Sequence, residues 1–344
     1  MQPERNISKK EVEMKKFLAA CLITFFSGFA FSQGSLTQVI KAFDEDFMNA
    51  QSTTAQVTLG FITYEDSNTC GTIVPYLQSE IKSAVENTRR ISIVKTTELS
   101  EYEQAGIATR GLSMGMSANA KKAGEKKYIL DGKYYDKGSY IELVLSMHDA
   151  DGNVFAKKTA SIDKSVIEEF DLTLYPENKK IAETIQTDFD KTENEQKKNS
   201  KSSIAVAASM LDSSGSLVNI LHPNDIVRFK ISTDTDCYIA ILCIDANGIK
   251  TWLPITNNYM EADTPRMFPD ISGAVLKVDN NGVYGAEQVI IYACTNEAGL
   301  PNQNDNGKYS NQDLHLIMKK QQSAKENKSY QTGTFKITYT VMEK

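Results

Sequence analysis

The sequence predicts an α+β fold in two domains, a mixed α/β sheet domain followed by a β-sandwich. Strand and helix patterns alternate between residues 56 and 162, which is typical of a sheet covered by helices. From residue 204 onward the apolar segments are short strands separated by turns, which is typical of a sandwich. Between them, Asp188–Ser203 is polar and charged, as linkers are. The predicted domains cover residues 33–190 and 204–344, with a linker at 191–203.

The chain begins with the pattern of a secretory signal in residues 1–32. Lys15 and Lys16 precede an apolar run from Phe17 to Phe31, which ends at small residues before Gln33. The run is shorter than the roughly 20 residues of a membrane-spanning helix. We therefore expect an exported protein that is periplasmic or associated with the outer membrane.

Two features of this signal leave alternatives open. Met14 directly precedes the basic pair, so it is an alternative start. We favour cleavage after Ser32, which places small residues at the −3 and −1 positions, Ala30 and Ser32. The alternative is a lipid anchor at Cys21, in a lipobox-like Leu18–Cys21, although most of the apolar run follows that cysteine.

The charge of the chain argues against nucleic acid as a partner. The sequence has 38 basic and 44 acidic residues, a net charge of −6. Residues 1–32 hold five Lys or Arg and three Asp or Glu, so the remainder carries a net charge of −8. Binding to nucleic acid depends on neutralising phosphates with a basic surface. We also expect no cofactor, and no second apolar run is long enough to span a membrane.

The first domain is predicted element by element from periodicity. Gln56–Thr63 alternates as a strand, and Thr72–Glu86 has helical spacing with Pro75 in its first turn. Ile91–Lys95 is a second strand. The remaining elements are a helix at Ser117–Ala123, strands at Tyr128–Tyr135, Tyr140–His148 and Val154–Ile162, and a last helix from Asp163 that includes Ile181–Phe189 and is interrupted at Pro176.

Residues 56–162 resemble the FlgO/CsgG/LpoB group of bacterial envelope proteins. The likeness is carried by Val57–Phe61, the helix with Leu77 and Ile81, the strand Ile91–Val94, and Ala123–Gly132 with the hairpins that follow it. Members of this group lie in the periplasm or at the outer membrane and work by contacting other proteins. The resemblance implies that role and implies no catalysis.

The second domain is predicted around one apolar strand, Cys237–Ile244, which has the composition of a buried central strand. The turn Asp245–Gly248 leads into the hairpin strand Ile249–Leu253. The other predicted elements are strands at Ile204–Leu211, Asp225–Ser232, Ala274–Val278, Glu287–Thr295 and Thr334–Met342, and a short helix at Asp313–Lys320.

Residues 222–341 resemble a bacterial β-sandwich domain of unknown function. The likeness is carried by three segments: Phe229–Ile255, with its Cys-Tyr-Ile-Ala-Ile-Leu strand and Leu-Pro segment, Gln288–Cys294, and Gly333–Tyr339. No activity is implied by it.

Four cysteines follow the signal: Cys70, Cys237, Cys243 and Cys294. Cys237 and Cys243 lie six positions apart in one strand, roughly 20 Å at strand rise, so they cannot pair with each other. Either of them could form a disulfide with Cys294 if the two strands are neighbours. We favour the alternative that all four are small buried thiols. None has the close paired spacing of a zinc site.

No motif in the sequence predicts catalysis or a metal site. Gly111–Gly115 matches the G-x-S-x-G pattern around Ser113, but no apolar strand precedes it, as a nucleophile elbow requires. The three histidines lie far apart in the sequence. Asp149–Asn153 is interpreted as a hairpin turn and Asp44–Asp46 as a solvated helix or loop face. We therefore expect a protein that is not an enzyme.

One cluster of aromatic and methionine residues is a candidate binding surface. Trp252, Tyr259, Met260, Met267 and Phe268 flank Leu253-Pro254. Such a cluster either binds a partner or packs over the edge of the sandwich, and we favour packing. The function expected overall is that of an exported envelope protein acting by protein–protein contact. The alternative is a ligand-binding protein that recognises a glycan or peptide through the sandwich.

Overall fold

A computed structural model describes residues 34–50, 55–94, 127–149, 152–187, 189, 203–279, 282–297, 300 and 330–343. Several predicted features lie outside the described residues: the export signal with Cys21, the helix Ser117–Ala123, the motif at Gly111–Gly115, all but the last residue of the linker, and the helix Asp313–Lys320.

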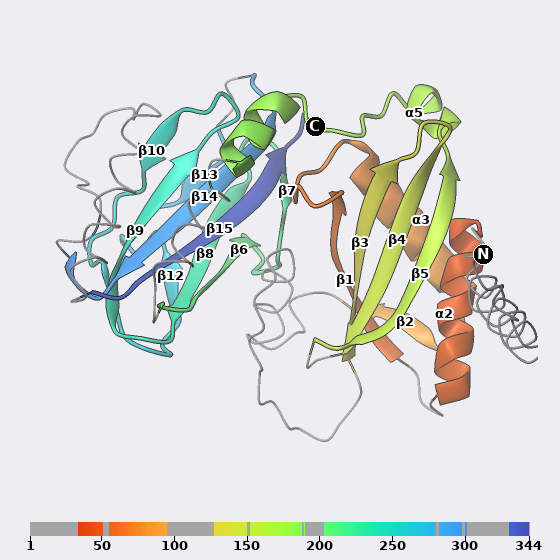
Figure 1. The fold of residues 1–344 in the computed structure, drawn as a ribbon, viewed down its shortest axis with the longest axis horizontal. Coiled ribbons are helices and arrows are strands. Elements are labelled where there is room, and N and C mark those ends of the chain that lie inside the picture. The colour runs from red at the N-terminus through yellow and green to blue at the C-terminus, as the bar shows by residue number, and fades with distance from the viewer. Residues whose placement is uncertain are drawn as a thin grey trace, which may run out of the picture.

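The α+β prediction is confirmed, and the N-terminal unit is built on one mixed sheet (Figure 1). Its strand order is β2-β1-β3-β4-β5. Strand β1 (Ala55–Tyr64) runs parallel to β2 (Ile91–Val94) and to β3 (Lys127–Asp136). Strands β4 (Tyr140–Asp149) and β5 (Val154–Asp163) follow as antiparallel hairpin neighbours. All five strands agree with the sequence prediction to within one or two residues.

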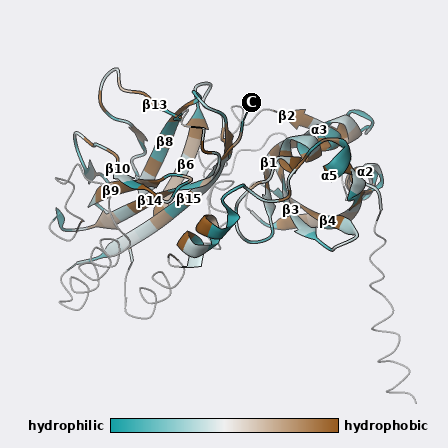
Figure 2. Cartoon of the chain, turned by 90° about the horizontal axis from the view of Figure 1, so that it is seen from above, coloured by the Kyte–Doolittle hydropathy of each residue, from teal (hydrophilic) through white to brown (hydrophobic). Residues whose placement is uncertain are grey.

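Among the described residues, helices α2 (Leu36–Ala50) and α3 (Ile73–Glu86) cover one face of this sheet. Helix α3 buries its apolar side, including Leu77 and Ile81, against the sheet. Helix α2 packs beside it. In both views these helices lie on the side of the sheet away from the C-terminal unit (Figures 1 and 2). The other face is therefore turned toward that unit.

Helix α2 and its buried carboxylate were not expected from the sequence. Asp44 was interpreted as part of a solvated face, but it is only 7% exposed. Its carboxylate accepts the backbone N–H of Arg90 at 2.9 Å and that of Arg89 at 3.4 Å. The donors lie 45 and 46 positions later in the chain and reach Asp44 only through the tertiary fold. No local sequence pattern could therefore indicate that Asp44 is buried.

The C-terminal unit is a sandwich of two sheets around the strand predicted to be central. That strand, β9 (Cys237–Ile244), pairs with β14 (Gly285–Cys294), which in turn pairs with β15 (Thr332–Val341). The rest of this sheet is β7 (Ile220–Leu221), β10 (Lys250–Trp252) and β11 (Tyr259–Met260); the second sheet holds β6 (Val206–Asp212), β8 (Ile226–Thr233), β12 (Arg266–Phe268) and β13 (Leu276–Lys277).

The helix predicted around Ile181–Phe189 packs on the sandwich. Short helix α5 (Ser165–Glu169) comes first, and the chain becomes helical again at residues 179–187, after Pro176. Phe189 and the partly buried Ile185 pack with Trp252 and Tyr292 on the outer face of the β9–β14 sheet. The helix thus precedes the predicted linker in sequence but belongs in space to the C-terminal sheet.

Candidate functional site

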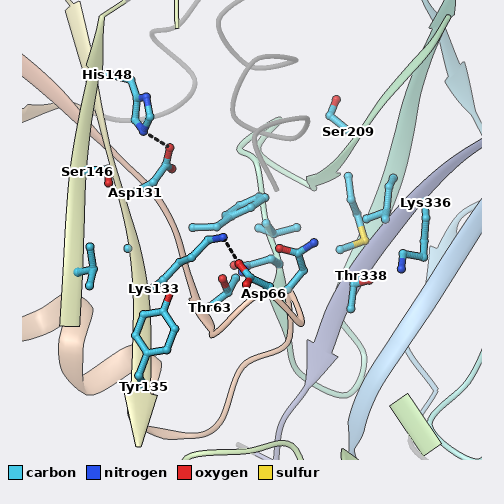
Figure 3. Close-up of a pocket in the computed structure, with 18 of the residues that line it drawn as sticks. Thr63, Asp66, Asp131, Lys133, Tyr135, Ser146, His148, Ser209, Lys336 and Thr338 are labelled. Atoms are coloured by element: carbon cyan, nitrogen blue, oxygen red, sulfur yellow. Dashed lines mark hydrogen bonds and ion pairs between the residues drawn. The ribbon is translucent and has the colours of Figure 1, made fainter. Parts of the chain in front are cut away.

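A cavity of about 470 Å³ lies between the two units (Figure 3). Its first wall is the face of the N-terminal sheet opposite α2 and α3, and its second wall comes mainly from β6 and β15. Strand alternation explains the first wall. Asp131, Lys133 and Tyr135 of β3 face the cavity, while Leu130 and Tyr134, at even-numbered positions of the same strand, are buried on the helix side.

Two pairs of titratable side chains lie on the first wall: Lys133 with Asp66, and His148 with Asp131 (Figure 3). Lys133 Nζ is 2.5 Å from Asp66 Oδ1, with side chains 42% and 85% exposed. His148 Nε2 is 3.7 Å from Asp131 Oδ2, and these side chains are only 15% and 20% exposed. The first pair is a solvated rim interaction of small energetic value. The second pair sits deeper in the cavity wall, where water screens the charge of the Asp131 carboxylate less.

A glycine makes room for the Asp131 carboxylate. A Cβ added to Gly60 of β1 would lie 1.8 Å from Asp131 Oδ1 and 2.9 Å from its Cγ. The pairing of β1 with β3 shifts register between Leu59 and Ile62, so the bulge lies at this point. Bulges often re-aim side chains next to functional sites. Gly60 and the bulge together therefore allow the carboxylate to lie over the backbone of β1.

The second wall is mostly neutral. Ser209 and Asn219 are buried, and the Asn219 amide donates to Cys70 Sγ at 3.4 Å. Thr338 Oγ1 is buried and has no hydrogen-bond partner among the described residues. Lys336 is buried as well, and its ammonium donates to Gln186 Oε1 and lies 4.6 Å from the centre of the Phe189 ring. The apolar part of the second wall is formed by Met210, Val218 and Ile337.

Direct contacts hold the two walls in place. Asn178 donates to the carbonyls of Ala246 and Ala286 at 2.8 Å each, and its Oδ1 accepts the Ala286 N–H at 2.7 Å. The Cys70 N–H donates to Thr340 Oγ1 at 3.0 Å. Met342 of the C-terminal unit is buried in the N-terminal core. The cavity is therefore preformed, because both of its walls are tied to the same set of buried contacts.

Cys70 is buried at this junction and is a poor nucleophile. Burial raises the pKa of its thiol to about 12, so the thiolate is scarce at neutral pH. Beside it, the Gly71 N–H donates to the Tyr134 hydroxyl, which donates to the carbonyl of Leu174, each at 2.8 Å. Burial likewise raises the pKa of Tyr134. These groups stabilise the junction.

The five residues of the predicted aromatic and methionine cluster do not form one surface. Met260 and Phe268 are buried in the sandwich core, and Trp252 packs with Tyr292 on the opposite face of the sheet. Only Tyr259 and Met267 are exposed, by 40% and 38%. They belong to strands of different sheets, β11 and β12. Strand alternation separates them, because each lies next to a residue that faces the core.

All four cysteines in the described part of the chain are free thiols. Strands β9 and β14 are neighbours, as the disulfide alternative required. However, Cys237 and Cys243 pack on the sandwich-core side, whereas Cys294 packs on the outer side. Side chains on opposite faces of a sheet cannot bridge. Burial raises the pKa of Cys243 to about 12.

Sequence reasoning missed the cavity residues, including the pairing of His148 with Asp131. The signal that could have found them is the hairpin turn after β3, because its register places residue 131 opposite residue 146. No group of three or more metal-binding side chains comes together within the described ranges. Nor does any helix in those ranges combine the length and the apolar character that crossing a membrane requires.

Comparison with known proteins gives loose structural likenesses only. No family model matches the chain, and no curated protein matches it. The LpoB C-terminal domain from Escherichia coli aligns at 9% identity with a TM-score of 0.25, covering 38% of this chain and 98% of that one. The same domain from Salmonella enterica aligns at 10% identity with a TM-score of 0.24, covering 38% and 96%. Likenesses this distant assign no activity to the chain.

Proposed function

We propose that this is an exported, non-enzymatic protein of the cell envelope that acts by binding, in the periplasm or at the outer membrane. One observation carries the binding role: a preformed cavity of about 470 Å³ is lined by side chains from both units. Small-molecule sites typically have volumes of about 300–1,000 Å³ and a few convergent polar groups in an apolar lining. A cavity of this volume favours a small ligand, and the site spans both units instead of the sandwich alone.

The experiment blocks the cavity with one large side chain. Ser146 of β4 lines the cavity, so Ser146→Trp fills part of it. Thr251→Trp is the matched control, because Thr251 is exposed on β10, the strand at the edge of the sandwich away from the N-terminal unit (Figure 1). Protein purified from the exported fraction is incubated with the low-mass fraction of an envelope extract and examined by native mass spectrometry.

We expect the unchanged protein and Thr251→Trp to show a protein–ligand complex in the mass spectrum. We expect Ser146→Trp to have lost this complex. The same bound mass in all three proteins would refute the cavity as the binding site. Intact mass of the unliganded protein also tests export. A chain beginning at Gln33 is expected, whereas a lipid adduct at Cys21 would replace the soluble form with an anchored one.

A second binding mode, contact with an envelope protein partner, is supported by a different observation. Four large apolar side chains between residues 259 and 275 are 37–56% exposed: Tyr259, Met267, Ile271 and Val275. Exposed apolar groups of this kind are common at protein contacts. Met267→Ser and Val275→Ser together should abolish cross-linking to a defined envelope protein, while Ser146→Trp should leave it unchanged. Cross-linking that survives the double substitution would exclude Met267 and Val275 from the contact.

A further inference from the structure

A row of three polar side chains crosses the cavity wall from β3 to β5. Asp131 is opposite Ser146 in the β3–β4 pairing, and Ser146 is opposite Lys157 in the β4–β5 pairing. All three line the cavity. Neighbouring strands are about 4.8 Å apart, so the two charged ends of the row are separated by roughly 10 Å at the backbone.

The two ends of the row differ in charge, and both residues line the cavity. Asp131 is held over Gly60, and its Oδ2 lies 3.7 Å from His148 Nε2. Lys157 is exposed at the other end. Its neighbour Lys158 faces the helix side of the sheet, where it pairs with Asp46 at 2.7 Å. A carboxylate, a hydroxyl and an ammonium thus follow one another across the wall.

The opposite wall suits the uncharged part of a ligand. Met210, Val218 and Ile337 supply apolar surface to the cavity. The buried hydroxyl of Thr338, the residue after Ile337, belongs to the same wall and has no hydrogen-bond partner among the described residues. A buried hydroxyl of this kind gains free energy when a ligand supplies a hydrogen bond.

We infer that the cavity binds a short peptide with free termini. Its ammonium pairs with Asp131, its carboxylate pairs with Lys157, and its main chain passes Ser146. An apolar side chain contacts Met210 and Ile337. Three residues in extended conformation reach at most about 10–11 Å, which matches the length of the row. This inference rests on the proposed function and names the ligand class for the same site.

The charge pattern discriminates against two other classes of ligand. A simple anion would be attracted by Lys157 but repelled by Asp131, since like charges brought together across an interface are costly. A neutral glycan would leave both charged groups without a partner of opposite charge in the ligand. Only a ligand with both charges, separated by two strand spacings, satisfies both ends of the row.

The test is isothermal titration calorimetry of the exported protein with the tripeptide alanyl-leucyl-alanine. The same peptide with an acetylated amino terminus, the same peptide with an amidated carboxyl terminus, and a neutral chitin trisaccharide are the comparison ligands. The variants are Asp131→Asn and Lys157→Gln. Lys158→Gln is the matched control, because this lysine is the next residue of the same strand and faces the opposite side.

Binding of the free tripeptide is expected to weaken roughly tenfold or more with either blocked terminus and with Asp131→Asn or Lys157→Gln. It should be unchanged by Lys158→Gln. Equal affinity for the blocked peptides would overturn the inference, and so would binding of the trisaccharide alone. If the tripeptide does not bind while Ser146→Trp still removes the native bound mass, the ligand class is wrong and the proposed function stands. If neither signal appears, both are wrong.

Discussion

Replacing Gly60 with alanine tests how the cavity wall is built. The added Cβ would lie 1.8 Å from Asp131 Oδ1 and 3.1 Å from Ile129 Cγ2. Gly60 is not among the residues with positive φ, so its backbone conformation is compatible with alanine. The obstacle to the substitution is a steric clash with neighbouring side chains. The carboxylate must therefore move. Overpacking of this kind costs typically about 1–3 kcal/mol.

A double-mutant cycle isolates the clash with the carboxylate. Gly60→Ala is made in the unchanged chain and in an Asp131→Ala background, where the nearest obstructing atoms are gone. Alanine in a strand is otherwise favoured over glycine by roughly 0.5–1 kcal/mol. We therefore expect Gly60→Ala to destabilise the unchanged chain by about 1–2 kcal/mol and to be close to neutral beside Asp131→Ala, a coupling of at least about 1 kcal/mol.

The assay is urea unfolding followed by far-UV circular dichroism, from which the free energy of unfolding is obtained for the four proteins of the cycle. An equal loss in both backgrounds would refute the reasoning, because it would show that the clash lies with Ile129 or the backbone. The substitution should also weaken tripeptide binding, since the displaced carboxylate no longer meets the ligand ammonium.

Three further predictions follow from the contacts described above. Asn178→Ala should cost about 2–4 kcal/mol in urea unfolding, because three hydrogen bonds to Ala246 and Ala286 are lost in a partly buried place; a loss under about 0.5 kcal/mol would contradict the role assigned to this side chain. Burial raises the pKa of Glu287, so its contribution to stability is fullest below the unfolded-state pKa of about 4.3 and is lost as the pH rises through the raised value. As the pH rises from about 4.3 through the raised pKa, the free energy of unfolding of Glu287→Gln should therefore increase relative to that of the unchanged chain. If the difference between the two free energies did not change with pH, burial of the carboxylate would be excluded. Finally, the thiols of the chain beginning at Gln33 should resist Ellman's reagent in the native state and titrate as four per chain in urea without reductant; two per chain would reveal a disulfide.

Much of the secondary structure could be predicted because its causes are local. The two hairpins of the N-terminal sheet have Asp-Gly turn chemistry, and in the structure Asp136 Oδ1 accepts the Gly138 N–H at 2.9 Å. Apolar character alone identified β9 as central, and its limits are those predicted. The short strands β7, β11 and β12 were not predicted, because two or three residues carry no detectable period.

The candidate binding residues were harder to predict, because exposure depends on which face of a strand meets a neighbour. Tyr259 and Met260 are adjacent in the sequence, yet Met260 is buried and Tyr259 is 40% exposed. The sequence pattern placed both in one cluster. Only the pairing of β11 with β9 decides which of them points into the core.

The sequence by itself determined the α+β class, the order of the strands along the chain and the hairpin register, since these follow from periodicity and turn residues close together in the chain. That register already aligns Asp131, Ser146 and Lys157 in one row. Only the tertiary structure decided that the row faces a cavity. The contacts that close it join Cys70 to Thr340 and Asn178 to Ala286, across 270 and 108 positions. Contacts so remote in sequence depend on how whole sheets pack, and no local pattern encodes them.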